Sequence, residues 1–300
     1  MTASLLGTLD PPPGETAVPA FREGWLEPGA DEPRPFLSYL SEAADVQWSS
    51  ELESLHEEPS RTHFIDVLTR ALAIHALEPP MLGERPVIVD LGCSTGHFLR
   101  DLETECPQAF LAGVDAVPDG LIHAHAAVPR AALFHASVTD LPFGKGTVDG
   151  AVALNLLEHI SDDVLVLREL ARILRPGGRA VVIVPANPRL YDAYDAYLGH
   201  ERRYARGELA RKASQSGLET RSRAYVGSLV YPGFWAVKKL HRLRYRSASP
   251  ARAREVVTRN IAATHGSRLG KLASRIEERL ARAGVSLPFG IRELTVLERP

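Results

Sequence analysis

Three aspartates of this sequence, Asp90, Asp115 and Asp140, each follow a short run of apolar residues. Runs of this kind, bounded by glycine or proline, are typical of buried strands. A single aspartate in such a place often caps a helix or lies in a surface turn. A series of three favours a different role, because an open α/β sheet binds its ligands beyond the carboxyl ends of its strands. The spacing therefore predicts a ligand site lined by these carboxylates.

A glycine turn follows the first of these strands, in the segment DLGCSTG at residues 90–96. Gly92 and Gly96 let the backbone turn tightly and approach a ligand without an intervening Cβ. A dinucleotide-binding loop has the pattern G-x-G-x-x-G, and a P-loop carries a Lys-Ser/Thr pair. Here the acid precedes the glycines, and neither the third glycine nor the Lys-Ser/Thr pair follows. The loop is therefore expected to hold its ligand other than by a phosphate.

This segment resembles the first motif of class I S-adenosylmethionine-dependent methyltransferases of the broad type 11 family, with Ser94 in place of the usual middle glycine. Four further segments resemble later motifs of that family in the same order. They are 110–115, 133–143, 147–160 and 174–185. The resemblance implies an α/β fold with a Rossmann-like sheet that is mostly parallel and whose last strand is antiparallel.

The resemblance also implies S-adenosyl-L-methionine as the cofactor. The glycine loop would hold the methionine end, Asp115 the ribose hydroxyls and Asp140 the adenine amine, while Cys93 packs or offers its backbone N–H. The residues expected to bind the cofactor on this basis are Asp90, Gly92, Cys93, Ser94, Gly96, Asp115, Ala116, Thr139, Asp140 and Asn155.

Methyl transfer from a sulfonium needs mainly an acceptor held in line, so a general base is required only for an acceptor that arrives protonated. Glu158 and His159, which follow the fourth expected strand, are candidates for this role. His200 and Tyr204 are further candidates, because residues 198–204 resemble an H-x-R-x-Y element of the type 11 family. His159 could equally make a structural hydrogen bond at the start of a helix.

A metal site is not expected. Some relatives carry the motif E-x-x-E-H after the fourth strand and bind a divalent metal there. This chain has Asn155 at the first position of that motif, so Glu158 and His159 alone remain, and two ligands make a poor site for a hard cation. The sequence therefore predicts a transferase that works without a metal.

Length and composition limit the class of protein. The 300 residues are 45% hydrophobic, enough for one α/β domain with an appendage, and the net charge of −2 argues against general affinity for nucleic acid. The two cysteines do not suggest a disulfide framework. We find neither a leader pattern nor an apolar run long enough to span a bilayer, so the sequence predicts a cytoplasmic protein, monomeric or homodimeric.

Charge is unevenly distributed along the chain. Residues 1–60 hold twelve acidic and two basic residues, whereas 235–284 holds thirteen basic and three acidic residues. One interpretation is that the two segments are solvated surfaces or pack on one another. The other is that the basic segment binds an anion. Within it, residues 229–246 combine aromatic and aliphatic residues with Lys238 and Lys239. That composition suits core packing, an acceptor pocket, or peripheral contact with a membrane surface.

The chain divides into five parts. Residues 1–35, rich in proline and acids, predict a disordered or extended tail, and 36–80 predict a helical cap over the cofactor. Residues 81–227 form the expected core, 228–288 a helical insertion on the acceptor side, and 289–300 the final strand.

The sequence thus predicts a methyltransferase acting on a small, isoprenoid, polyketide-like or otherwise anionic or apolar metabolite. One alternative is a non-catalytic protein that binds the cofactor for regulation, and another is a methyltransferase of a membrane-associated lipid or quinone. An NAD-dependent oxidoreductase is disfavoured by the glycine pattern.

Overall fold

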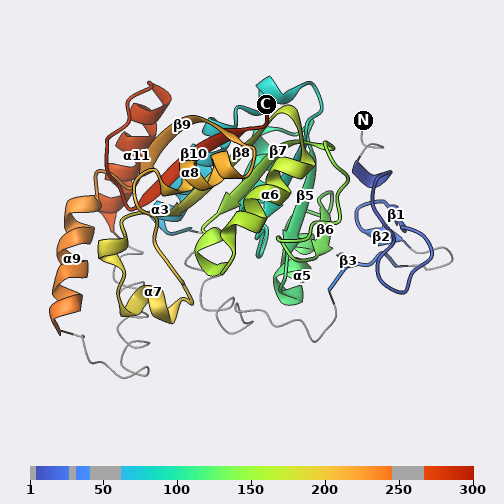
Figure 1. Cartoon of the computed structure of the whole chain (residues 1–300), viewed down its shortest axis with the longest axis horizontal. Helices are drawn as coiled ribbons and strands as arrows, with labels where there is room; N and C mark the ends of the chain where they lie inside the picture. Colours follow the sequence, from blue (N-terminus) through green and yellow to red (C-terminus); the bar gives the residue numbers. More distant parts are fainter. Residues whose placement is uncertain (1–4, 27–31, 41–61, 245–266) are drawn as a thin grey trace.

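The computed structural model describes residues 5–26, 32–40, 62–244 and 267–300, and its centre is an eight-stranded sheet (Figure 1). The strands lie in the order β3-β6-β5-β4-β7-β8-β10-β9. They are β3 (Leu37–Ser38), β4 (Val87–Leu91), β5 (Phe110–Asp115), β6 (Ala132–His135), β7 (Val148–Leu154), β8 (Leu174–Pro185), β9 (Glu219–Val226) and β10 (Arg292–Glu298). β10 pairs antiparallel with both neighbours and the other pairs are parallel, as the sequence predicts.

Helices cover both faces of this sheet: α3 (Phe64–Leu77), α4 (His97–Glu105) and α5 (Pro118–Ala127) on one face, and α6 (Asp163–Ile173) and α8 (Glu208–Gln215) on the other. The further helices are α7 (Ala193–Tyr197), α9 (Tyr231–Arg244) and α11 (Arg268–Arg282). Strand side chains alternate between two apolar cores: in β4, Val89 joins the core under α6 and α8, whereas Ile88 joins the core under α3, α4 and α5. Burial on both faces explains why the parallel strands read as continuous apolar runs.

Residues 5–26, expected to be disordered or extended, pack on the sheet and are not a free tail. The side chains of Leu5 and Trp25 are fully buried. The Trp25 indole N–H donates to the carbonyl oxygen of Leu133 at 3.1 Å, and its ring lies 5.3 Å from that of Phe134. The short strands β1 (Ala20–Phe21) and β2 (Trp25–Leu26) form a hairpin here. Burying such large side chains stabilises the segment despite its prolines and acids.

The segment 36–80, where a helical cap over the cofactor was expected, has a different structure. Leu37 and Ser38 extend the sheet edge as β3, and residues 41–61 lie outside the described residues. α3 is a helix as predicted, but its apolar side chains, among them Leu68 and Leu72, pack in the second core. α3 therefore covers one face of the sheet and does not lie over a ligand site, because its apolar side chains pack against the apolar surface of the strands.

The insertion at 228–288 contributes α9 and α11, with residues 245–266 outside the described part. α11 packs on α3, and a Cβ at Gly270 would stand 2.6 Å from the Phe64 ring. Glu277 of α11 accepts hydrogen bonds from the backbone N–H groups of Gly227 and Ser228, at 2.7 and 3.0 Å. These bonds fix the chain where it leaves β9.

α9 exposes apolar side chains while burying one of its lysines. Trp235 and Leu240 are each 44% exposed, whereas Lys238 is only 5% exposed. Lys238 and Lys239, although adjacent in sequence, therefore point in different directions, since only Lys239 is exposed. Peripheral membrane contact through 229–246 stays a prediction. Among the described residues, none of the helices is both long and apolar enough to cross a bilayer.

Candidate functional site

The glycine loop leaves β4 and enters α4 through three residues with positive φ. Gly92 has φ +72° and Gly96 has φ +79°, while Ser94 between them has φ +47°. A Cβ at Gly96 would stand 3.0 Å from the backbone of Ala124, so the glycine also permits close packing of α4 on α5. Ser94 stands where the family has its middle glycine and adopts the left-handed conformation that favours glycine. This conformation costs a residue with a side chain about 1–2 kcal/mol.

Asp115 ties this loop to the end of β5. Its Oδ2 accepts a hydrogen bond from the backbone N–H of Ser94 at 2.8 Å, and its Oδ1 accepts one from Val117 at 2.9 Å. Each carboxylate oxygen has a second lone pair, so the carboxylate can still accept bonds from a ligand diol. Asp90 lies nearby and is buried, and burial first, then the charge of Asp115, raises its pKa well above the ordinary value.

The remaining expected cofactor residues follow neighbouring strands. Ala116 follows β5 and Asn155, with φ +50°, follows β7. β6 ends at His135, so Thr139 and the exposed Asp140 lie in the loop after it and not at the end of the strand itself. Because β6, β5, β4 and β7 are adjacent and parallel, all these positions follow the same edge of the sheet. The role of each in binding stays a prediction.

Glu158, His159 and His200 come together beyond the end of β7. One ligand atom of each lies within 4.8 Å of those of the other two, and the two imidazole rings are 4.8 Å apart. Glu158 is fully buried, and within the described part of the chain neither of its carboxylate oxygens has a hydrogen-bond partner. Burial is the main cause that raises the pKa of Glu158, and the charge of His200 opposes it.

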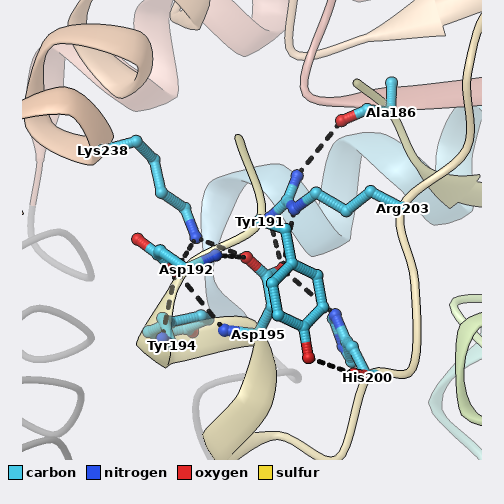
Figure 2. A network of polar contacts seen from close by, with 8 residues as sticks. All are labelled: Ala186, Tyr191, Asp192, Tyr194, Asp195, His200, Arg203 and Lys238. Atoms are coloured by element: carbon cyan, nitrogen blue, oxygen red, sulfur yellow. Dashed lines mark hydrogen bonds and ion pairs between the residues drawn. The ribbon is translucent and has the colours of Figure 1, made fainter. Parts of the chain in front are cut away.

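His200 is held in place by a buried polar network (Figure 2). Its Nδ1 lies 3.2 Å from Oδ1 of Asp195, and its carbonyl oxygen accepts a hydrogen bond from the Tyr191 hydroxyl at 2.6 Å. Arg203 donates to the same Asp195 oxygen at 2.8 Å, and Lys238 donates to Asp195 Oδ2 at 2.9 Å. Although burial alone would raise it, these partners hold the pKa of Asp195 below its usual range.

Tyr204 has a different environment from the one expected of a base. It is fully buried, and its hydroxyl donates to Oδ2 of Asp163 at 2.6 Å, an oxygen that also accepts from Lys212 at 2.7 Å. Burial, followed by Asp163, raises the pKa of Tyr204. A hydroxyl whose proton is engaged by a buried carboxylate is poorly placed to take another proton, so this geometry gives Tyr204 a structural role.

Two residues of this region, Asp195 and Gly113, were missed in the sequence. Asp195 gave no recognisable signal, because His200 and Arg203 follow it at five and eight residues and its third partner, Lys238, lies 43 residues away. Gly113 did give one, since glycine inside a strand often marks a close approach. A Cβ there would stand 2.8 Å from Sγ of Cys93, so Gly113 makes room for the buried cysteine of the loop.

The expectation of no metal rested on counting two donors, Glu158 and His159. The structure adds His200, which is distant in sequence, as a third. The premise of that expectation is therefore incomplete.

Residues 89–182 match the type 11 family model described as a methyltransferase domain. A ubiquinone/menaquinone biosynthesis C-methyltransferase from Syntrophotalea carbinolica is 32% identical over 123 residues, which cover 38% of this chain and 51% of that protein. A trans-aconitate 2-methyltransferase from Azoarcus sp. is 33% identical over 124 residues, 41% of this chain and 48% of that protein. The chain thus spans about half the length of these relatives.

The fold is also similar to solved structures. Geranyl diphosphate C-methyltransferase from Streptomyces coelicolor, solved with Mg²⁺, geranyl-S-thiolodiphosphate and S-adenosyl-L-homocysteine, superposes with a TM-score of 0.55. The similarity covers 86% of this chain and 83% of that one at 16% sequence identity. At this identity the similarity shows the fold alone.

Proposed function

We propose that residues 89–182, which match the family model of a methyltransferase domain, form a class I S-adenosylmethionine-dependent methyltransferase domain and that the chain uses it to methylate a small-molecule acceptor. The observation that carries the proposal is the contact between Asp115 and the glycine loop. The carboxylate accepts a bond from Ser94 N–H at 2.8 Å, and a carboxylate can accept several hydrogen bonds at once, as a ribose diol would require. Loop and ribose acceptor are thereby held in one arrangement before the cofactor arrives.

The acceptor would lie beyond β7, beside Glu158, His159 and His200. The relatives described above are named for quinone biosynthesis and for trans-aconitate, and a small, oxygen-bearing acceptor suits the same cluster. The sulfonium methyl is already activated, so the domain contributes chiefly by holding the acceptor in line. His159, or His200 oriented by Asp195, would accept a proton from an acceptor that arrives protonated.

The partly exposed histidines favour an enzyme over a regulatory cofactor-binding protein. His159 and His200 are of intermediate exposure, and the His200 side chain is 11% exposed. A protein that only senses the cofactor has no need of such groups beside it. Whether the acceptor is a lipid, a quinone or another small molecule is part of this proposal and does not follow from the fold.

The cofactor assignment is tested by titration calorimetry with S-adenosyl-L-homocysteine. Asp115→Asn keeps the shape of the side chain but removes its charge, and each charge-assisted hydrogen bond is worth about 1.5–3 kcal/mol. We expect affinity to fall at least tenfold. Asp162→Asn, the same change at an exposed N-terminal position of α6, is the matched control and should leave affinity unchanged.

Equal affinity of the wild type and Asp115→Asn would refute the ribose assignment. Transfer itself is tested with methyl-labelled cofactor and a small-molecule extract of the native host. Label should enter an extract component with the wild type and enter it much more slowly with Asp115→Asn at low cofactor concentration. Tight cofactor binding without any transfer would favour the regulatory alternative.

A further inference from the structure

We propose that Glu158, His159 and His200 form a binding site for one divalent transition-metal ion. The three side chains come from two separate segments, 158–159 after β7 and the loop after α7, and each offers one ligand atom within 4.8 Å of the others. Two imidazoles and one carboxylate are a ligand set that proteins use for such ions, with further coordination positions left open.

Glu158 is the strongest indication of a missing cation. Its side chain is fully buried, and across the described ranges neither carboxylate oxygen accepts a hydrogen bond. A buried carboxyl without hydrogen-bond partners is costly even beside the charges of Arg203 and Arg292, and native structures rarely keep one unless an ion or water completes it. The histidines beside it do not satisfy it, because no hydrogen bond joins either ring to those oxygens.

His200 is oriented as metal-binding histidines usually are. Such histidines give one ring nitrogen to the metal and donate the other N–H to a carboxylate, which fixes the tautomer and the ring plane. Here Nδ1 faces Asp195 Oδ1 at 3.2 Å, which leaves Nε2 as the ligand atom. Asp195 is itself fixed by Arg203 at 2.8 Å and by Lys238 at 2.9 Å. The polar network shown in Figure 2 thus holds His200 in the orientation that a metal ligand needs.

The distances require a small closure on binding. Ligand atoms about 2.0–2.2 Å from a common ion stand roughly 3–3.5 Å from one another. The longest separation, up to 4.8 Å, must therefore shorten by roughly 1.3–1.8 Å. Rotation of the Glu158 carboxylate can supply part of this without breaking any hydrogen bond, because it makes none among the residues described.

Ligand chemistry selects the kind of ion. Imidazole suits Zn²⁺, Fe²⁺, Ni²⁺ and Cu²⁺, whereas Mg²⁺ and Ca²⁺ prefer ligand sets made of oxygen. We therefore expect Zn²⁺ or Co²⁺ to bind more tightly than Mg²⁺. The open positions would take water or an oxygen of the acceptor. With the ion bound, the ion would take over from the histidines the activation of a protonated acceptor, and this use rests on the proposed function.

The test is metal binding by the whole chain after removal of bound metal with a chelator. Co²⁺ is followed by its visible absorption, which reports the coordination geometry of the ion, and Zn²⁺ by calorimetry. We expect Co²⁺ and Zn²⁺ each to saturate at one equivalent per chain, and Mg²⁺ not to saturate at the same concentrations. His159→Ala, His200→Ala and Glu158→Gln should each weaken Zn²⁺ binding at least tenfold. His75→Ala, at an exposed histidine of α3, is the control and should bind within threefold of the wild type.

A second measurement guards against variants that lose their structure. Zn²⁺ should raise the melting temperature of the wild type, since a ligand that binds only the folded state stabilises it, and should raise that of Glu158→Gln much less. Glu158→Gln changes neither size nor shape, so it decides the matter if His200→Ala unfolds. Equal Zn²⁺ binding by the wild type and the three variants, or no saturable binding by the wild type, would overturn the site.

The same samples are titrated with S-adenosyl-L-homocysteine, so the two proposals can fail separately. Cofactor binding without Zn²⁺ binding overturns the metal site and leaves the methyltransferase. Zn²⁺ binding without cofactor binding overturns the proposed function and leaves the metal site.

Discussion

Replacing Lys238 should loosen α9, whereas the same change at its neighbour Lys239 should not. The ammonium of Lys238 donates to Asp192 Oδ1 at 2.6 Å and to Asp195 Oδ2 at 2.9 Å (Figure 2), and the side chain is 5% exposed. Lys239 is exposed, and its ammonium lies over the Trp235 ring at 4.9 Å. The pair offers the same residue type in two environments on one helix.

The magnitudes follow from these environments. Breaking a buried ion pair from one side costs about 3–5 kcal/mol, because the remaining charge loses its partner. Lys238→Met keeps the aliphatic stem, and Asp195 keeps Arg203 and the bond to His200, so the lower end applies. We expect a loss of about 3 kcal/mol. Lys239→Met removes an exposed cation–π contact, worth about 0.5–1 kcal/mol.

Hydrogen exchange of the α9 amides is the suitable assay, because a helix can detach without global unfolding. A loss of about 3 kcal/mol corresponds to roughly a hundredfold faster exchange of residues 231–244 in Lys238→Met, against less than about fivefold in Lys239→Met. Strands β4 and β7 should exchange as in the wild type. If both variants exchanged α9 at the same rate, the ion pair would not hold the helix and the reasoning would be refuted.

Two further predictions concern pH and packing. The pKa of Asp90 is higher in the folded state than in the unfolded chain, so the folded state keeps this proton to a higher pH. The free energy of unfolding of the wild type, measured without cofactor, should therefore fall as pH rises from about 4. Asp90→Asn should show a smaller fall, because Glu158 and Glu293, whose pKa values are also raised by burial, still contribute to it. An equal dependence of the two proteins on pH from 4 to 8 would contradict this prediction. Gly270→Ala should lose about 1–3 kcal/mol in urea unfolding through contact with Phe64, whereas Gly233→Ala, which meets nothing within 4 Å in α9, should be neutral or stabilising. Equal effects would mean that Gly270 is not a packing contact.

The parts predicted well from sequence are those governed by local rules. The glycine turn after β4 and the strand ends at Asp90 and Asp115 follow from apolar runs and backbone freedom over a few residues. β10 beside β9 followed from the family resemblance. For such features a window of a dozen residues contains the determining interactions.

The rest depends on partners far apart in the chain. Trp25 packs with Phe134, more than a hundred residues away, and averaging composition over 1–35 hid that anchor. Lys238 pairs with Asp195, and the helical pattern of α9 could not show which lysine faced inward. His200 became a third donor beside Glu158 only when the loop after α7 folded back over the end of β7. None of these pairings leaves a local pattern.

The place of β10 between β8 and β9 sets the order in which the sheet can be completed during synthesis. β8 pairs with β10 from Pro185 to Arg179, so its outer edge has no partner until residues 292–298 emerge from the ribosome. At about 5–20 residues per second, the roughly hundred residues between Pro185 and Arg292 take about 5–20 s to make. Over that interval the nascent chain presents the apolar edge Ala180–Val184 to its surroundings, which is the kind of edge on which chains aggregate. Chaperone supply and slower translation during expression should therefore affect the yield of this protein more than its final stability suggests.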